Sequence, residues 1–116
     1  MFGLTASNHI YLYRDACDMR KSFDGLCGIV RCELGADPLC GSLFVFVNKR
    51  RNRVKLLYWD RDGLALWYKR LERGCFILPP GCHPEGHIER RDLLMLLEGI
   101  EPKKIAKRYK KYEVNT

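Results

Sequence analysis

Residues 43–71 read LFVFVNKRRNRVKLLYWDRDGLALWYKRL, and this stretch decides the fold. Its first part, 43–47, is continuously apolar, which is typical of a central strand that is covered on both faces. The part 53–59 alternates between two faces, as a strand does, and 64–71 is a further strand. The pair Asp62-Gly63 between these two parts is a tight hairpin signal, because both residues tolerate positive φ. The stretch therefore predicts three successive strands.

On the N-terminal side of this stretch, residues 9–13 are rich in β-branched and aromatic residues and predict a short strand. Asp18 is a predicted helix N-cap, an apolar stripe at helical spacing follows it, and Gly35 ends the helix. Residues 75–78 predict another strand, and 90–97 predict a second helix that stops at Gly99. The expected fold class is α+β. A single domain at residues 1–102 is predicted to contain an antiparallel sheet of four to five strands and two packed helices, and a basic C-terminal tail follows at 103–116.

The positive charge of the chain is concentrated at one end. The chain has 116 residues and a formal net charge of +7, and residues 103–116 carry six basic residues and one acidic residue. Such a balance favours anionic partners, nucleic acid above all. The first residues do not resemble a signal peptide, and the longest apolar runs are too short to span a membrane. We therefore expect a cytoplasmic protein without membrane contact.

Six cysteines are expected to be free thiols in a reducing compartment rather than a disulfide framework. Four residues, Cys75, Cys82, His83 and His87, offer zinc-ligand chemistry within a short segment. Their spacing lacks the close cysteine pair of structural zinc sites, so a loop with incidental ligand types is the preferred interpretation. No metal or other cofactor is expected.

Several short motifs together resemble a known family. They are DMRK at 18–21, FDGL at 23–26, LFVF at 43–46, RVKL at 53–56, WDRDGL at 59–64, KRLERG at 69–74 and LLEGI at 96–100. In this order they resemble the TnpB-type accessory proteins of insertion-sequence-sixty-six family transposable elements, which are distinct from the RNA-guided nuclease of the same name. The resemblance implies an accessory role in DNA transposition, beside a separate and larger transposase.

Three groups of basic residues are candidates for contact with nucleic acid. The first is the turn and strand start after residue 47, where a protruding hairpin would neutralise phosphates; the alternative is a solubilising turn. The second lies at the expected helix start and strand ends, and the third is the tail. The three groups are Lys49, Arg50, Arg51, Arg53 and Lys55; Arg20, Lys21, Lys69, Arg70 and Arg73; and Lys104, Lys107, Arg108 and Lys111.

Two other patterns have a structural interpretation that we prefer to the functional one. The aromatic residues Tyr58, Trp59, Trp67 and Tyr68 could stack on bases, but large aromatics mostly supply buried core area. Asp60 and Asp62 could hold a metal for phosphoryl chemistry, but they bracket a turn whose geometry explains them. No catalytic residue is expected, and the chain is predicted not to be an enzyme.

The predicted function is that of an accessory protein in insertion-element transposition, which binds DNA at the element ends or the transposase–DNA complex. The alternative is an adaptor that contacts the transposase without touching nucleic acid.

Overall fold

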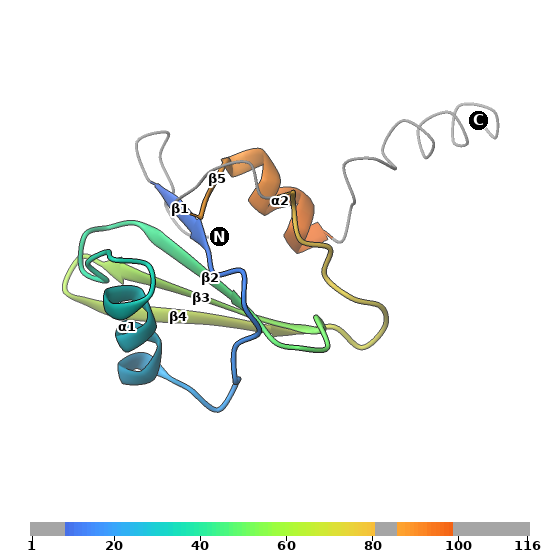
Figure 1. The fold of residues 1–116 in the computed structure, drawn as a ribbon, viewed down its shortest axis with the longest axis horizontal. Helices are drawn as coiled ribbons and strands as arrows, with labels where there is room; N and C mark the ends of the chain where they lie inside the picture. Colours follow the sequence, from blue (N-terminus) through green and yellow to red (C-terminus); the bar gives the residue numbers. More distant parts are fainter. Residues whose placement is uncertain (1–8, 81–85, 99–116) are drawn as a thin grey trace.

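The computed structural model describes residues 9–80 and 86–98, which form five strands and two helices (Figure 1). In chain order these are β1 (Ile10–Leu12), α1 (Phe23–Cys32), β2 (Leu43–Val47), β3 (Arg53–Asp60), β4 (Gly63–Arg70), β5 (His87–Ile88) and α2 (Arg90–Glu98). The strands form one sheet in the order β4-β3-β2-β1-β5. The α+β class is confirmed, but the sheet is mixed rather than fully antiparallel, because β1 and β2 are parallel.

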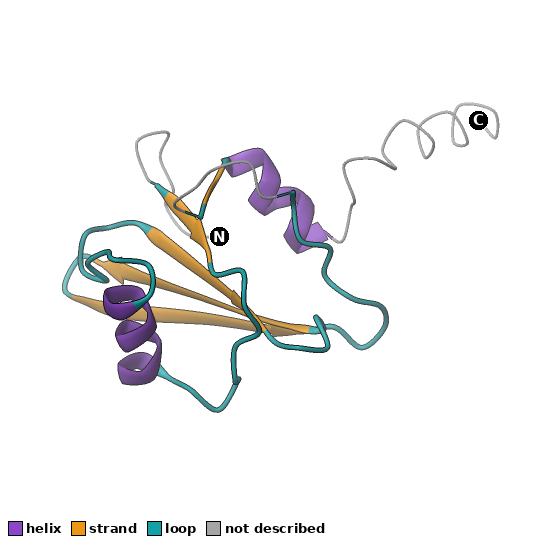
Figure 2. Ribbon diagram, in the orientation of Figure 1, coloured by secondary structure: helices purple, strands orange, loops and turns teal. Residues whose placement is uncertain are grey.

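The two helices cover opposite faces of the sheet (Figure 2). On one face, the α1 residues Leu26 and Val30 pack with Phe44 and Phe46 of β2. On the other face, leucines of α2 pack with the alternate residues of β2, among them Val45. All five β2 side chains are buried, as the continuously apolar run predicts for a central strand.

Helix α1 is the crossover that lets β1 and β2 lie parallel. Two parallel neighbours need a connection long enough to return to the starting end of the sheet, and a helix usually provides it. Residues 13–42 supply this connection. The helix ends as predicted near Gly35, whose φ of +62° is the left-handed conformation that favours glycine.

The predicted start of α1 is wrong, because the helix begins at Phe23 and not after Asp18. Asp18 instead forms a turn, in which its carboxylate accepts a hydrogen bond of 2.9 Å from the backbone N–H of Arg20. In a helix starting at Met19, the carbonyl of Met19 would accept a bond from the next turn. Here that carbonyl accepts from the side chain of Lys55 at 2.8 Å, so a tertiary contact replaces the first helical turn.

Two further differences concern the segment after β4. Residues 75–78 are not a strand, although Phe76 is fully buried and donates its backbone N–H to the carbonyl of Arg51. Strand β5 was not predicted, because its two residues are too few to form a pattern. Gly99 and the tail at 103–116 lie outside the described residues, so the domain boundary at 102 stays a prediction.

Candidate nucleic-acid interface

The turn between β2 and β3 is built around Asn48. Its side-chain oxygen accepts hydrogen bonds of 3.0 Å from the backbone N–H groups of Asn52 and Arg53, and its amide donates to the Asn52 side chain at 2.8 Å. Arg51 has a φ of 58°, a left-handed conformation that costs a non-glycine residue about 1 kcal/mol. These bonds hold Lys49, Arg50 and Arg51 exposed on a turn of defined shape.

The segment after β4 folds back onto this turn. Leu71 donates its backbone N–H to the Asn52 carbonyl at 2.7 Å, and Phe76 donates to the Arg51 carbonyl. The Cys75 thiol lies 3.3 Å from the carbonyl oxygen of Arg50. A loop anchored at both ends in this way holds the exposed Arg73 beside the basic turn, although the two are far apart in sequence.

Strands β3 and β4 add two more arginines at the same end of the sheet. Arg53 and Arg70 are direct cross-strand partners, an arrangement that places two like charges side by side. Arg53 donates to the hydroxyl of Tyr68 at 3.1 Å, and Arg70 forms an ion pair of 2.9 Å with Glu72. Lys69 is exposed and paired with Val54, so it lies on the α2 side of the sheet.

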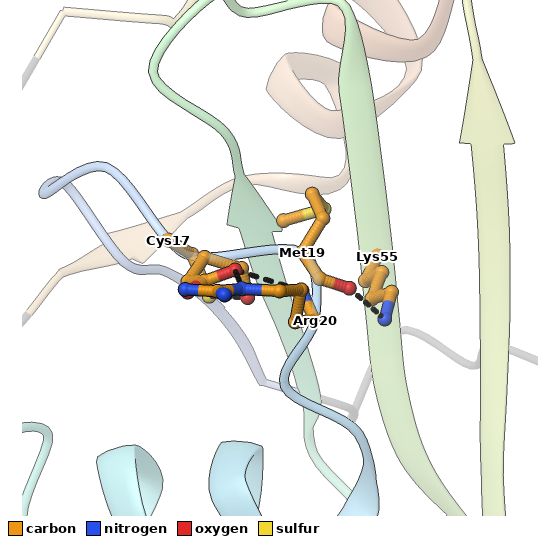
Figure 3. A network of polar contacts seen from close by, with 5 residues as sticks. Cys17, Met19, Arg20 and Lys55 are labelled. Atoms are coloured by element: carbon orange, nitrogen blue, oxygen red, sulfur yellow. Dashed lines mark hydrogen bonds and ion pairs between the residues drawn. The ribbon is translucent and has the colours of Figure 1, made fainter.

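The structure places Lys55 differently from the rest of the predicted basic hairpin. Its side chain is buried, with 6% of the residue exposed. The ammonium Nζ donates to the carbonyl oxygen of Met19 at 2.8 Å (Figure 3). It also donates to the carbonyl oxygen of Lys21 at 2.8 Å and lies 4.8 Å from the centre of the Tyr68 ring. A buried ammonium that is already hydrogen-bonded is not offered to a phosphate. Lys55 therefore has a structural role, and its prediction as a contact to nucleic acid is corrected.

The two bonds from Lys55 attach the loop before α1 to the face of β3 and β4. They bring Arg20 and Lys21 to the end of the sheet where Arg53 and Arg70 lie. Arg20 is itself ion-paired with Asp18 at 2.7 Å, and its side chain is 91% exposed. The hydrogen bonds from Arg20 lower the pKa of the Asp18 carboxyl to about 2. Asp18 is therefore charged at neutral pH and offsets part of the local positive charge.

We call the surface assembled in this way the basic end of the sheet. It draws on three segments that are distant in sequence, and it contains Arg20, Lys21, Lys49, Arg50, Arg51, Arg53, Arg70 and Arg73, with Lys69 on the opposite face at its margin. The other end of β3 and β4 is the tip Asp60-Arg61-Asp62, where acidic residues dominate. The charged groups are thus separated along the long hairpin.

Among the aromatic residues, Tyr58 and Trp67 are half-buried and pack against the α2-side cluster, as the core interpretation predicts. Tyr68 is 46% exposed and lies in the basic end, bonded to Arg53. The hydroxyl of Tyr68 and the anchoring role of Lys55 were missed by sequence reasoning. The sequence does contain a signal from which these contacts could have been found, which is the two-residue turn at 61–62. This turn sets the register of the hairpin, and the register pairs residue 53 with 70 and residue 55 with 68.

The acidic tip has the geometry of a hairpin turn. Asp60 and Gly63 are paired across a two-residue loop, and Arg61 adopts a φ of 57°. Within residues 9–80 and 86–98, no cluster of three or more His, Cys, Asp or Glu side chains is arranged to hold a metal ion. Cys82 and His83 lie outside the described residues, as do the tail residues Lys104, Lys107, Arg108 and Lys111. Neither described helix has the length and apolarity that a membrane crossing needs.

Comparison with known proteins places these features in a family. Residues 8–107 match the family described as IS66 Orf2 like protein. The protein y4jC of Sinorhizobium fredii, named as uncharacterized, is 36% identical over 101 residues, which cover 87% of this chain and 86% of the relative. A second uncharacterized protein of that organism, y4hO, is 37% identical over 84 residues, covering 72% and 73%. No solved structure matches the chain. The chain belongs to the IS66 Orf2-like family, which carries an accessory role in insertion-sequence transposition.

Proposed function

We propose that this protein is a non-catalytic accessory factor of transposition whose basic end contacts the DNA phosphates of the element ends, alone or together with the transposase. The observation that carries the proposal is the gathering of cations from three distant segments at one end of the sheet. Membership of the IS66 Orf2-like family supports the role in transposition. The tail residues Lys104, Lys107, Arg108 and Lys111 are proposed as further phosphate contacts.

Phosphate contact has a measurable signature in its dependence on salt. Each neutralised phosphate releases condensed counterions, so the logarithm of the binding constant falls with the logarithm of salt concentration by about 0.9 per contact. A surface that uses four to six of its cations would lose affinity steeply as salt is raised. A protein adaptor that never touches DNA would show no such duplex binding.

Two arginines in left-handed conformations provide a matched pair of variants. Arg51→Gly removes one charge from the basic end, and Arg61→Gly removes one charge from the acidic tip. Glycine adopts positive φ without strain, so both variants are expected to unfold at the same or a slightly higher urea concentration than the parent. Any difference in their DNA binding therefore reports the position of the lost charge and not a loss of folding.

We expect Arg51→Gly to weaken binding to a duplex of the element end several-fold and to reduce the salt slope by about 1. Arg61→Gly should leave both quantities close to those of the parent. The measurement is fluorescence anisotropy with the full chain at several salt concentrations, with and without transposase. Equal salt slopes for the parent and both variants would contradict contact through the basic end. Binding to transposase without any binding to duplex would favour the adaptor function instead.

A further inference from the structure

Strand β4 is an edge strand with an unusual surface. It has eight residues, and among the strands that the structure describes only β3 lies beside it. None of its side chains is buried, although it carries the apolar run Leu64–Trp67, whereas every residue of β2 is buried. The outer edge of such a strand offers unpaired main-chain N–H and C=O groups to any second strand.

Proteins commonly protect an edge strand with charges, proline or a bulge. In β4 the charges stand only at its end, at Lys69 and Arg70, and the sequence 63–68 contains neither charge nor proline. Its register with β3 continues without a bulge from the Asp60–Gly63 pair to the Arg53–Arg70 pair. Among residues 9–80 and 86–98, only β3 pairs with this strand, so its middle is a regular edge with half-buried apolar side chains on both faces.

The distribution of charge selects the partner. The start of β4 adjoins the acidic tip with Asp60 and Asp62, and its end carries Lys69 and Arg70. In an antiparallel pair centred on Leu66, Asp62 of each copy would lie opposite Arg70 of the other, although Asp60 would lie opposite Glu72. A parallel copy would place like charges together. The edge is thus complementary to itself when turned by a two-fold rotation, which is the symmetry of the commonest homodimers.

We propose that β4 pairs antiparallel with β4 of a second copy of this chain, which joins the two five-stranded sheets into one continuous sheet across a two-fold axis. This dimer does not rest on the proposed DNA contact. Where both hold, the two basic ends lie at diagonally opposite corners of the joined sheet, an arrangement suited to holding two DNA segments.

The faces of the sheet restrict the register of this pairing. Leu64 and Leu66 lie on the α1 side and Trp67 lies on the α2 side. A two-fold axis normal to the sheet keeps these faces, so even-numbered residues oppose even-numbered ones. With Leu66 opposite its own copy, Leu64 opposes Tyr68 and Ala65 opposes Trp67, a small side chain against a large one. The same register sets Asp62 against Arg70.

Arg70 has donors left for this contact. Glu72 accepts from its Nε and Nη2 within the same chain, and a guanidinium has five N–H groups in all. In the proposed register Asp60 instead opposes Glu72, an acidic pair beyond the end of the strand. The two aspartates of one tip are therefore expected to behave differently, which gives the test its control.

The experiment is sedimentation equilibrium of the full chain and of charge-reversal variants across a range of protein concentrations. Asp62→Lys and Arg70→Asp are each expected to raise the dimer dissociation constant roughly tenfold, because each change acts twice in a two-fold dimer. The double variant, Asp62→Lys with Arg70→Asp, should return the constant to near the parental value. Asp60→Lys makes the same charge change in the same tip and should not weaken the dimer.

Circular dichroism melts of all four variants establish that they fold, since every changed side chain lies on an exposed part of the surface. A parent that stays monomeric at every concentration would overturn the proposal, whatever its affinity for DNA. A double variant that failed to recover dimerisation would overturn it as well. A failure of duplex binding with an intact dimer would instead contradict only the proposed function.

Discussion

Replacing Lys55 with methionine is expected to lower the free energy of unfolding by about 2 kcal/mol. Lys55 is buried, and its ammonium is the hydrogen-bond donor for the carbonyls of Met19 and Lys21 at 2.8 Å. Methionine keeps an unbranched apolar side chain, one atom shorter than that of lysine, but leaves both carbonyls without that donor. Each part-buried acceptor left unpaired costs on the order of 1–3 kcal/mol, reduced where water reaches it.

An opposing effect must be weighed against this loss. Removing a buried ammonium also removes its desolvation penalty, and buried charges replaced by apolar groups are sometimes neutral for stability. Here the acceptors are backbone carbonyls that remain after the substitution, and the contact with the Tyr68 ring is lost as well. We therefore expect destabilisation, measured by urea denaturation.

The matched control is Lys49→Met, the same substitution at an exposed lysine of the neighbouring turn. A surface change of this kind is expected to alter stability by no more than about 0.5 kcal/mol. Equal unfolding midpoints for the two methionine variants would show that the bonds from Lys55 do not hold the loop at 18–22.

Truncation of Phe44 to alanine should have the largest effect on stability, a loss of about 3–5 kcal/mol. Phe44 is fully buried in the α1-side cluster, and its ring stacks on Tyr11 with centroids 5.2 Å apart. Its removal deletes apolar burial and leaves a cavity between the sheet and α1. A domain of this size has a total stability of roughly 5–15 kcal/mol, so the variant is expected to lose a substantial fraction of it.

Phe23→Ala provides the comparison, because Phe23 begins α1 and is 41% exposed. It deletes the same atoms with little cavity, so a loss below about 1 kcal/mol is expected from thermal and urea melts. If the two alanine variants were equally stable, the α1 side of the sheet would not be the core that the packing describes.

Much of the central fold can be predicted from local pattern. The strands at 43–47, 53–59 and 64–71 agree with β2, β3 and β4 within one or two residues, because the pattern, length and turn chemistry all point the same way there. The second helix also agrees, since its leucines recur at helical spacing. The resemblance to the family was carried by these same segments and is confirmed.

Two of the failures, the start of α1 and the strand predicted at 75–78, share one physical cause, which is competition from distant groups. Met19 belongs to an apolar pattern that is typical of a helix. Its backbone carbonyl, however, accepts a hydrogen bond from the side chain of Lys55, a residue 36 positions away. Phe76 lies in a segment rich in strand formers, yet its backbone is bonded to the Arg51 carbonyl of the β2–β3 turn rather than to a strand. Propensity describes a residue and its neighbours, so it has no information on such partners.

Sequence pattern alone was enough to predict the α+β class, the long central hairpin, the positive turn at 49–53 and the family of the chain. The tertiary structure was needed to show that β1 lies parallel to β2, that Lys55 is buried while Lys49, Arg50 and Arg51 are exposed, and that Arg20, Arg53 and Arg73 lie at one end of the sheet. The reason is that charge and periodicity are local properties of a chain. Which charged residues share a surface depends on hydrogen bonds such as those of Lys55 to Met19 and of Phe76 to Arg51. These bonds join segments that are far apart in the sequence.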